Sequence, residues 1–141
     1  MLSALHAADV EYLVVGAYAM AAHGYPRATG DIDFWVHSTK ENASRVWEAI
    51  TSFGAPTSQL KVEDFTTPDV VYQIGVAPQR IDILTSISGV EFEAAWDNRL
   101  IAELDGIVTS VIGRRELLQN KIATGRPKDL LDVKFLESNE T

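Results

Sequence analysis

The sequence predicts an α/β or α+β domain in which helices flank a short mixed β-sheet and also form the C-terminus. Three observations favour this class. Short apolar runs rich in Val, Ile and Leu indicate strands, segments with apolar residues at helical spacing indicate helices, and Gly or Pro residues separate the two. A chain of 141 residues is the usual size of one domain, so we expect a single domain over residues 1–141.

The first elements alternate between helix and strand. Residues 2–8 predict a short helix, and residues 11–16 (EYLVVG) predict a buried strand that ends at a glycine. The alanine-rich residues 17–24 contain no breaker before their last glycine and predict a helix that starts directly after that strand. A loop over 25–30 then leads to a second strand, DIDFWVH, at 31–37.

A longer helix and a hairpin follow. Residues 39–54 begin with a capping Thr, carry apolar residues at helical spacing and end at a glycine, which predicts a helix. Residues 70–76 and 80–86 predict two strands that a short turn joins into a hairpin.

The C-terminal third predicts a second hairpin and two helices. Residues 99–104 and 107–112 indicate short strands around Asp105 and Gly106, a dipeptide that favours a tight turn. Residues 114–125 predict a helix that ends at a glycine, and residues 126–137 predict another, with proline in its first turn.

Composition excludes several classes of function. The chain has no cysteine, which excludes disulfides, thiolate catalysis and cysteine-ligated zinc. Its net charge of −8 argues against a module that wraps nucleic acid in a basic surface, although an enzyme that contacts an RNA end locally stays compatible. The longest apolar run, residues 13–22, is too short for a membrane helix and the N-terminus does not resemble a signal peptide, so we expect a cytoplasmic protein without a membrane partner.

Two aspartates in the second predicted strand raise the functional question. Residues two apart in a strand point to the same face, so Asp31 and Asp33 should project together while Ile32 and Phe34 enter the core. Two carboxylates this close repel each other unless one keeps a proton, both face water, or a cation lies between them. The same alternation in RIDIL offers a third carboxylate, Asp82, on a strand that could lie beside the first.

The upstream strand and helix supply a complementary element. A strand that ends at Gly16 and passes straight into a helix presents backbone N–H groups to a phosphate, and glycine allows the phosphate to approach closely. Carboxylates that hold Mg²⁺ or Mn²⁺ beside a phosphate cradle are what metal-assisted phosphoryl or nucleotidyl transfer requires.

The combination resembles a known superfamily. VVGAYAMAAHGYPRATGDIDFWV, at 14–36, resembles the signature of nucleotidyltransferases with the DNA polymerase β-like palm fold: Gly, a small residue, a helix, then Asp-x-Asp. The segments HGYPRATGDID and NKIATGRPKDLLDVKFL are similar to bacterial nucleotidyltransferases of toxin–antitoxin and abortive-infection systems. One position departs from the pattern, because Ala17 stands where the superfamily most often has Gly or Ser.

The resemblance implies an activity and a set of site residues. It implies a Mg²⁺- or Mn²⁺-dependent enzyme that moves a nucleoside monophosphate from a nucleoside triphosphate to an acceptor hydroxyl and releases pyrophosphate. An RNA end, especially of tRNA, is the favoured acceptor, with a protein or a small molecule such as an antibiotic as alternatives, and a cognate antitoxin would be a further partner. The implied metal ligands and catalytic residues are Asp31, Asp33 and Asp82, and the implied nucleotide-binding residues are Gly16, Ala17, Arg27, Thr29, Lys121 and Lys128.

Plainer interpretations stay open beside these. Arg27 and Thr29 could simply satisfy their loop, Lys128 and Asp132 could form an ordinary i, i+4 pair, and His23 is better explained as a histidine at a helix C-terminus than as a ligand. The chain could also be a non-catalytic, antitoxin-like binding protein that keeps the fold. Ala17 is the one hint of this, because it lacks the hydroxyl with which a serine would contact phosphates.

Overall fold

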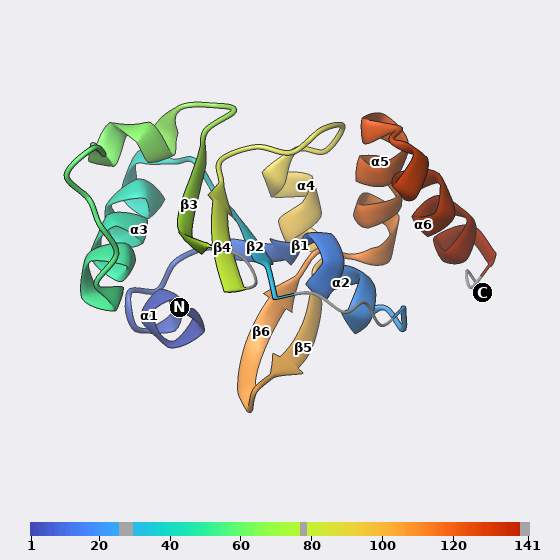
Figure 1. Ribbon diagram of the computed structural model, residues 1–141, viewed down its shortest axis with the longest axis horizontal. Coiled ribbons are helices and arrows are strands. Elements are labelled where there is room, and N and C mark those ends of the chain that lie inside the picture. The colour runs from blue at the N-terminus through green and yellow to red at the C-terminus, as the bar shows by residue number, and fades with distance from the viewer. Residues whose placement is uncertain (26–29, 77–78, 139–141) are drawn as a thin grey trace.

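The computed structural model describes residues 1–25, 30–76 and 79–138, and it is built on one six-stranded mixed sheet (Figure 1). The strand order is β3-β4-β2-β1-β6-β5. The strands are β1 (Tyr12–Val15), β2 (Ile32–Val36), β3 (Val71–Val76), β4 (Gln79–Leu84), β5 (Leu100–Leu104) and β6 (Ile107–Val111). The predicted class, a mixed sheet flanked by helices with two more helices at the C-terminus, is confirmed.

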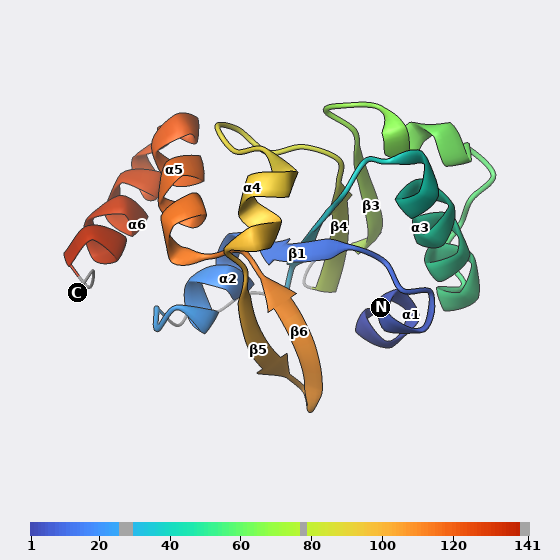
Figure 2. The ribbon, with the colours of Figure 1, turned by 180° about the vertical axis from the view of Figure 1, so that it is seen from behind.

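The pairing of the strands explains why the sheet is mixed. β1 and β2 are antiparallel, as are the two hairpins β3–β4 and β5–β6, whereas β2–β4 and β1–β6 are parallel. The predicted turn at Asp105 and Gly106 is confirmed, since both residues have a positive φ, as a two-residue type I′ turn needs. The β5–β6 hairpin extends away from the helices in Figures 1 and 2.

Helices lie at both ends of the molecule. α1 (Leu2–Ala7) and α3 (Lys40–Phe53) lie at the end where the chain begins, and α5 (Arg114–Thr124) and α6 (Pro127–Ser138) lie side by side at the other (Figures 1 and 2). α2 (Gly16–Ala22) starts directly at the end of β1, as predicted. The predicted caps of α3 are also present, because Thr39 accepts a hydrogen bond from the Asn42 N–H and Gly54 is left-handed.

Two short elements lie in regions that the sequence left unassigned. They are the 3₁₀ helix η1 (Val62–Thr66) and the helix α4 (Phe92–Asp97). α4 buries Phe92 and Ala95 on its inner side, and its Phe92 ring packs edge-on against Trp35 of β2. The core otherwise consists of the central strands and the inner faces of the helices. None of the helices in the described ranges is long and apolar enough to cross a membrane.

Candidate active site

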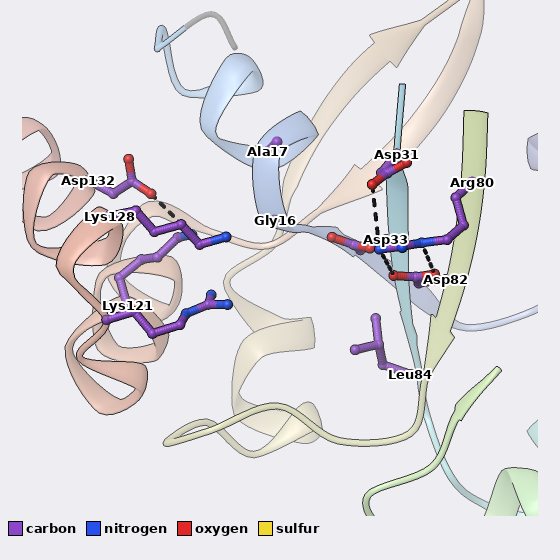
Figure 3. A pocket seen from close by; sticks show the side chains of 11 residues that line it. Gly16, Ala17, Asp31, Asp33, Arg80, Asp82, Leu84, Lys121, Lys128 and Asp132 are labelled. Atoms are coloured by element: carbon purple, nitrogen blue, oxygen red, sulfur yellow. Dashed lines mark hydrogen bonds and ion pairs between the residues drawn. The ribbon is translucent and has the colours of Figure 1, made fainter. Parts of the chain in front are cut away.

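An acidic face forms where β2 and β4 run side by side. The two strands are parallel and in register, and Asp33 of β2 is the direct partner of Asp82 of β4. The two carboxylates therefore face the same side of the sheet, as the alternation in the sequence predicts. Asp31 immediately precedes β2 and lines the same cavity, so the structure brings all three predicted aspartates together (Figure 3).

Gly16 lies directly against this acidic face. It has φ +71°, a conformation that L side chains rarely adopt, and a Cβ at this position would overlap the Asp33 carboxylate. The register explains the contact, because Val15 is paired with Asp33 across β1 and β2. Glycine is thus required here twice, once by the backbone and once by the neighbouring carboxylate.

The environment of Asp33 favours its protonated form. Burial is the largest cause, followed by the negative charge of Asp82, a hydrogen bond with Asp82 and the charge of Asp31, and together they raise the pKa of Asp33 to about 6. The part of this pKa shift that comes from Asp82 and Asp31 is repulsion between carboxylates, which a cation at this face would relieve.

Arg80, which the sequence analysis did not single out, supplies a positive charge to this face. Its Nε donates to Asp82 Oδ1 at 3.0 Å and its Nη2 donates to Asp82 Oδ2 at 3.3 Å. The same Nη2 lies 3.5 Å from Asp31 Oδ2, so one guanidinium joins two of the three carboxylates. Arg80 lies two residues before Asp82 on β4, and the alternation that placed Asp82 on this face places Arg80 there as well.

Lys121 lies at the far side of the cavity in a fixed position. It comes from α5, is buried, and its Nζ lies 3.3 Å from Asp129 Oδ1 and 3.2 Å from Asp132 Oδ2 of α6. Asp132, which the plainer interpretation pairs with Lys128, is thus also a partner of Lys121. Packing of α5 against α6 therefore holds this ammonium group at the wall of the cavity.

Asp129 organises the cations of this wall. Its Oδ2 accepts hydrogen bonds from Arg126 Nε at 2.7 Å and from the Thr124 hydroxyl at 2.8 Å. Burial alone would raise the pKa of Asp129, but these hydrogen bonds and the charges of Lys121 and Arg126 outweigh it and hold the pKa well below its usual range. An ionised Asp129 therefore fixes two cations at neutral pH.

The acidic face and the cationic wall enclose one cavity of about 470 Å³. Figure 3 shows the three aspartates and Arg80 on one side, with Lys121, Lys128 and Asp132 across from them. The lining residues are Gly16, Ala17, Asp31, Asp33, Arg80, Asp82, Leu84, Lys121, Arg126, Lys128 and Asp132. Seven of the nine predicted site residues are in this set, and the other two, Arg27 and Thr29, lie outside the described residues.

His23, which the sequence analysis treated as structural, and Trp35 of β2 both have structural contacts. His23 caps α2, and its Nε2 forms a hydrogen bond of 2.8 Å with the Ile112 carbonyl. Trp35 is almost completely buried among core residues. Neither residue lines the cavity between the aspartates and the lysines.

The donor set of the acidic face fits a hard divalent cation such as Mg²⁺ or Mn²⁺. Carboxylate oxygens are the ligands that such ions prefer, and a bound cation would relieve the repulsion by Asp82 and Asp31 that adds to burial in raising the pKa of Asp33. As the side chains stand, no three acidic or histidine residues in the described part of the chain are arranged around one metal position. The Arg80 guanidinium pairs with two of the carboxylates instead, so a metal ion would have to displace it.

Comparisons with known proteins identify a shared architecture. A crystal structure of a proposed nucleotidyltransferase from Thermotoga maritima superposes with a TM-score of 0.62 and 14% sequence identity, over 99% of this chain and 89% of that one. The two proteins share a fold. The fold expected from the resemblance to nucleotidyltransferases is therefore confirmed. A sequence identity of 14% is evidence for a shared fold and not for a shared activity. No family model and no curated protein sequence matches the chain.

Proposed function

We propose that this protein is a metal-dependent nucleotidyltransferase, which transfers a nucleoside monophosphate from a nucleoside triphosphate to an acceptor hydroxyl. The observation that carries the proposal is the single cavity that sets three aspartates on one side against two lysines and an arginine on the other. Carboxylates suit a divalent cation and ammonium or guanidinium groups suit a triphosphate, and this chemistry needs both within one site.

Asp31, Asp33 and Asp82 would hold Mg²⁺ or Mn²⁺ in this proposal. When bound, the cation would neutralise phosphate oxygens and stabilise the negative charge that develops in the transition state. Arg80 would leave Asp31 and Asp82 and could then pair with a phosphate, for which a guanidinium is well shaped. Asp82, freed from Arg80, would lie at the acceptor and receive the proton of its hydroxyl.

The cationic wall would bind the triphosphate. Lys121 and Arg126 are pre-positioned by Asp129, and Lys128 lines the same wall, so the protein loses little side-chain freedom when the phosphates bind. The absence of a Cβ at Gly16 leaves room beside Asp33, and the Ala17 backbone remains able to contact a phosphate even without a hydroxyl. Arg27 and Thr29 remain proposed nucleotide contacts from the sequence.

The reaction balances as a displacement at the α-phosphorus. The acceptor oxygen forms a bond to the α-phosphorus, the bond from that phosphorus to the bridging β-phosphate oxygen breaks, and pyrophosphate leaves. We favour an RNA end as the acceptor, as in the toxin-like enzymes that the sequence resembles. A protein or a small molecule could offer the same hydroxyl to the same core.

A second candidate is a binding protein that keeps the fold without turnover. Two observations favour it: the Arg80 guanidinium already neutralises two of the carboxylates, and Ala17 lacks a hydroxyl. The two candidates differ in whether the bound nucleotide is consumed. Such a protein would bind a nucleoside triphosphate and release it unchanged.

The test is transfer of label from α-phosphate-labelled ATP, GTP, CTP and UTP in the presence of Mg²⁺ or Mn²⁺. Total bacterial RNA and total bacterial protein would serve as separate acceptor pools, with Asp33→Asn and Asp82→Asn as inactive controls. Label that enters one pool with the wild type alone supports the enzyme and identifies the acceptor class. Nucleotide binding without transfer to either pool supports the binding protein, and the absence of both overturns the proposal.

A further inference from the structure

β5 is an edge strand of the sheet, and its outer side pairs with no other strand in the described part of the chain. The β5–β6 hairpin extends away from the helices, which leaves this edge accessible (Figures 1 and 2). Proteins usually protect a strand edge with proline, lysine, a bulge or a cover. β5 has the sequence LIAEL, without proline or lysine, and its register with β6 is continuous. The edge is therefore open to pairing with a further strand.

The hairpin register determines which backbone groups of β5 point outward. The two-residue turn that ends β5 closes on the pair of Leu104 with Ile107, which is a hydrogen-bonded pair in such hairpins. Hydrogen-bonded and non-hydrogen-bonded pairs alternate along antiparallel strands. Ala102 therefore directs its N–H and C=O groups to β6, whereas Ile101 and Glu103 direct theirs to the open edge.

The sequence of β5 and its two flanking residues is complementary to itself about Ala102. Leu100 and Leu104 lie two residues from Ala102 on either side, and Arg99 and Asp105 lie three residues from it. Two antiparallel copies of β5 centred on Ala102 would set Leu100 of each copy opposite Leu104 of the other. The same register sets Arg99 of each copy opposite Asp105 of the other.

The two charges at the ends of β5 are free for such pairing. The Arg99 guanidinium lies 3.9 Å from the centroid of the Trp96 ring, and its Nη1 donates to the Trp96 carbonyl at 2.8 Å. Asp105 is exposed in the turn. Over the described residues, Arg99 forms no ion pair with a carboxylate and Asp105 forms none with a cation. Each end of the strand thus presents a charge that a second copy would neutralise.

The exposed face of the hairpin adds apolar surface to this edge. Ile101 is 55% exposed and Val108 is 58% exposed. Val108 is the partner of Glu103, so it lies diagonal to Ile101 on the same face. In the antiparallel arrangement, Ile101 of one copy would lie diagonal to Ile101 of the other. The four apolar side chains would then form one stripe across both hairpins, and part of their surface would leave water.

We propose that two copies of this chain associate through β5, antiparallel about Ala102, and join their six-stranded sheets into one continuous sheet. The outward backbone groups of Ile101 in each copy pair with those of Glu103 in the other. No residue that lines the cavity of the proposed active site belongs to β5 or β6, so this inference does not depend on the proposed function.

The alternative registers of the same pairing are less favourable. A register centred on Glu103 would place this carboxylate directly opposite its own copy, and like charges directly opposite each other are destabilising. A register centred on Ile101 would leave Leu104 without its opposing leucine. The register about Ala102 is also the one in which the two strands overlap over their full length.

A single introduced thiol would report this register, because the chain has no cysteine. Ala102→Cys places two thiols at a non-hydrogen-bonded pair, whose Cα atoms lie about 4.5 Å apart, within the range that a disulfide spans. Ser58→Cys, in the exposed turn between α3 and η1, is the matched control for random collision. Both variants would be oxidised at the same protein concentration, and the disulfide-linked dimer would be measured by non-reducing gel electrophoresis.

The association itself would be measured by analytical ultracentrifugation of the full chain. Two five-residue strands form a small interface, so we expect a dissociation constant of about 10–100 μM. Ile101→Pro removes an N–H that points to the open edge and leaves the hydrogen bonds to β6 in place, and Ile101→Val is its matched control. Circular dichroism would verify that each variant is folded.

Ala102→Cys should give about tenfold more linked dimer than Ser58→Cys, and Ile101→Pro should weaken association about tenfold or more while Ile101→Val retains it. Equal yields of linked dimer in the two cysteine variants would overturn the register. A dimer that persists in Ile101→Pro would overturn the use of the β5 edge. A wild type that stays monomeric up to about 300 μM would overturn the proposal and leave the edge to a strand of a different protein.

Discussion

Replacing Asp33 by asparagine should stabilise the metal-free protein at neutral pH, although it removes a proposed metal ligand. The environment raises the pKa of Asp33 from 3.8 to about 6, mainly through burial and the charge of Asp82. Because the folded-state pKa lies above the unfolded one, the ionised carboxylate destabilises the fold, and the penalty grows as the pH rises from 3.8 to 6. An asparagine of the same shape carries no such penalty.

The magnitude follows from the difference between the two pKa values. About two pH units at 1.36 kcal/mol each give roughly 3 kcal/mol at pH 7.5. Asp33 is only partly buried, so solvent screening reduces this to about 1–3 kcal/mol. For a chain of this size the gain corresponds to a rise of about 3–10 °C in Tm. At pH 4.5 the Asp33 carboxyl is largely protonated in the folded state but still largely ionised in the unfolded state, so the gain should fall to roughly a third.

The assay is thermal unfolding by circular dichroism in EDTA at pH 4.5 and pH 7.5. Glu48→Gln removes one negative charge from the exposed face of α3 and controls for the change in net charge. The rise in Tm of Asp33→Asn should exceed that of the control at pH 7.5 and approach it at pH 4.5. A variant that is no more stable than the wild type at pH 7.5, or that gains equally at both pH values, would refute the account of Asp33.

Three further predictions concern other contacts. His37 lies between Glu11 and Glu93, and its ring nitrogens are 3.0 and 2.9 Å from the two carboxylates. Burial lowers the His37 pKa, but the hydrogen bonds to the two carboxylates outweigh burial, so the pKa is raised. Its contribution to stability should be complete below pH 6.5 and lost as the pH rises through its folded-state pKa, so unfolding curves of His37→Gln and the wild type should converge at high pH and not at low pH. Gly16→Ala should destabilise the fold by about 1–3 kcal/mol and weaken Mn²⁺ binding in calorimetry. Gly24→Ala, also at positive φ but with open space around it, should lower stability and leave Mn²⁺ binding unchanged. Equal Mn²⁺ affinity in the two variants would contradict the proposed contact between Gly16 and Asp33. Arg80→Gln should raise the affinity for Mn²⁺ by about three- to tenfold, because the guanidinium no longer competes for the carboxylates, and weaker binding would show that it assists the metal.

Local patterns in the sequence predict the acidic face well. Alternation of apolar and acidic residues in two strands places Asp33 and Asp82 on one side, and the only further requirement is that the strands are neighbours. The same alternation includes Arg80, but a charge at the start of a strand is common at the surface, and nothing local distinguishes it. The role of Arg80 depends on its contact with Asp31, which precedes β2, a different strand.

The cationic wall was harder to predict. The carboxylates that pair with Lys121 are decided by how α5 packs against α6, whereas spacing along the sequence indicates only a local i, i+4 pair of Lys128 with Asp132. The parallel pairing of β1 with β6 likewise joins segments almost a hundred residues apart, Val14 and Val111. Short elements such as α4 span too few residues for a periodic pattern to emerge.

The most direct test of the central claim compares α- and γ-labelled nucleoside triphosphate with the acceptor pool that accepts label. Displacement at the α-phosphorus predicts that the α-label enters the acceptor and that the γ-label appears in pyrophosphate, with neither event in Asp82→Asn. If the γ-label enters the acceptor and the α-label remains in a nucleoside diphosphate, the protein is a phosphotransferase and the proposed nucleotidyl transfer is wrong.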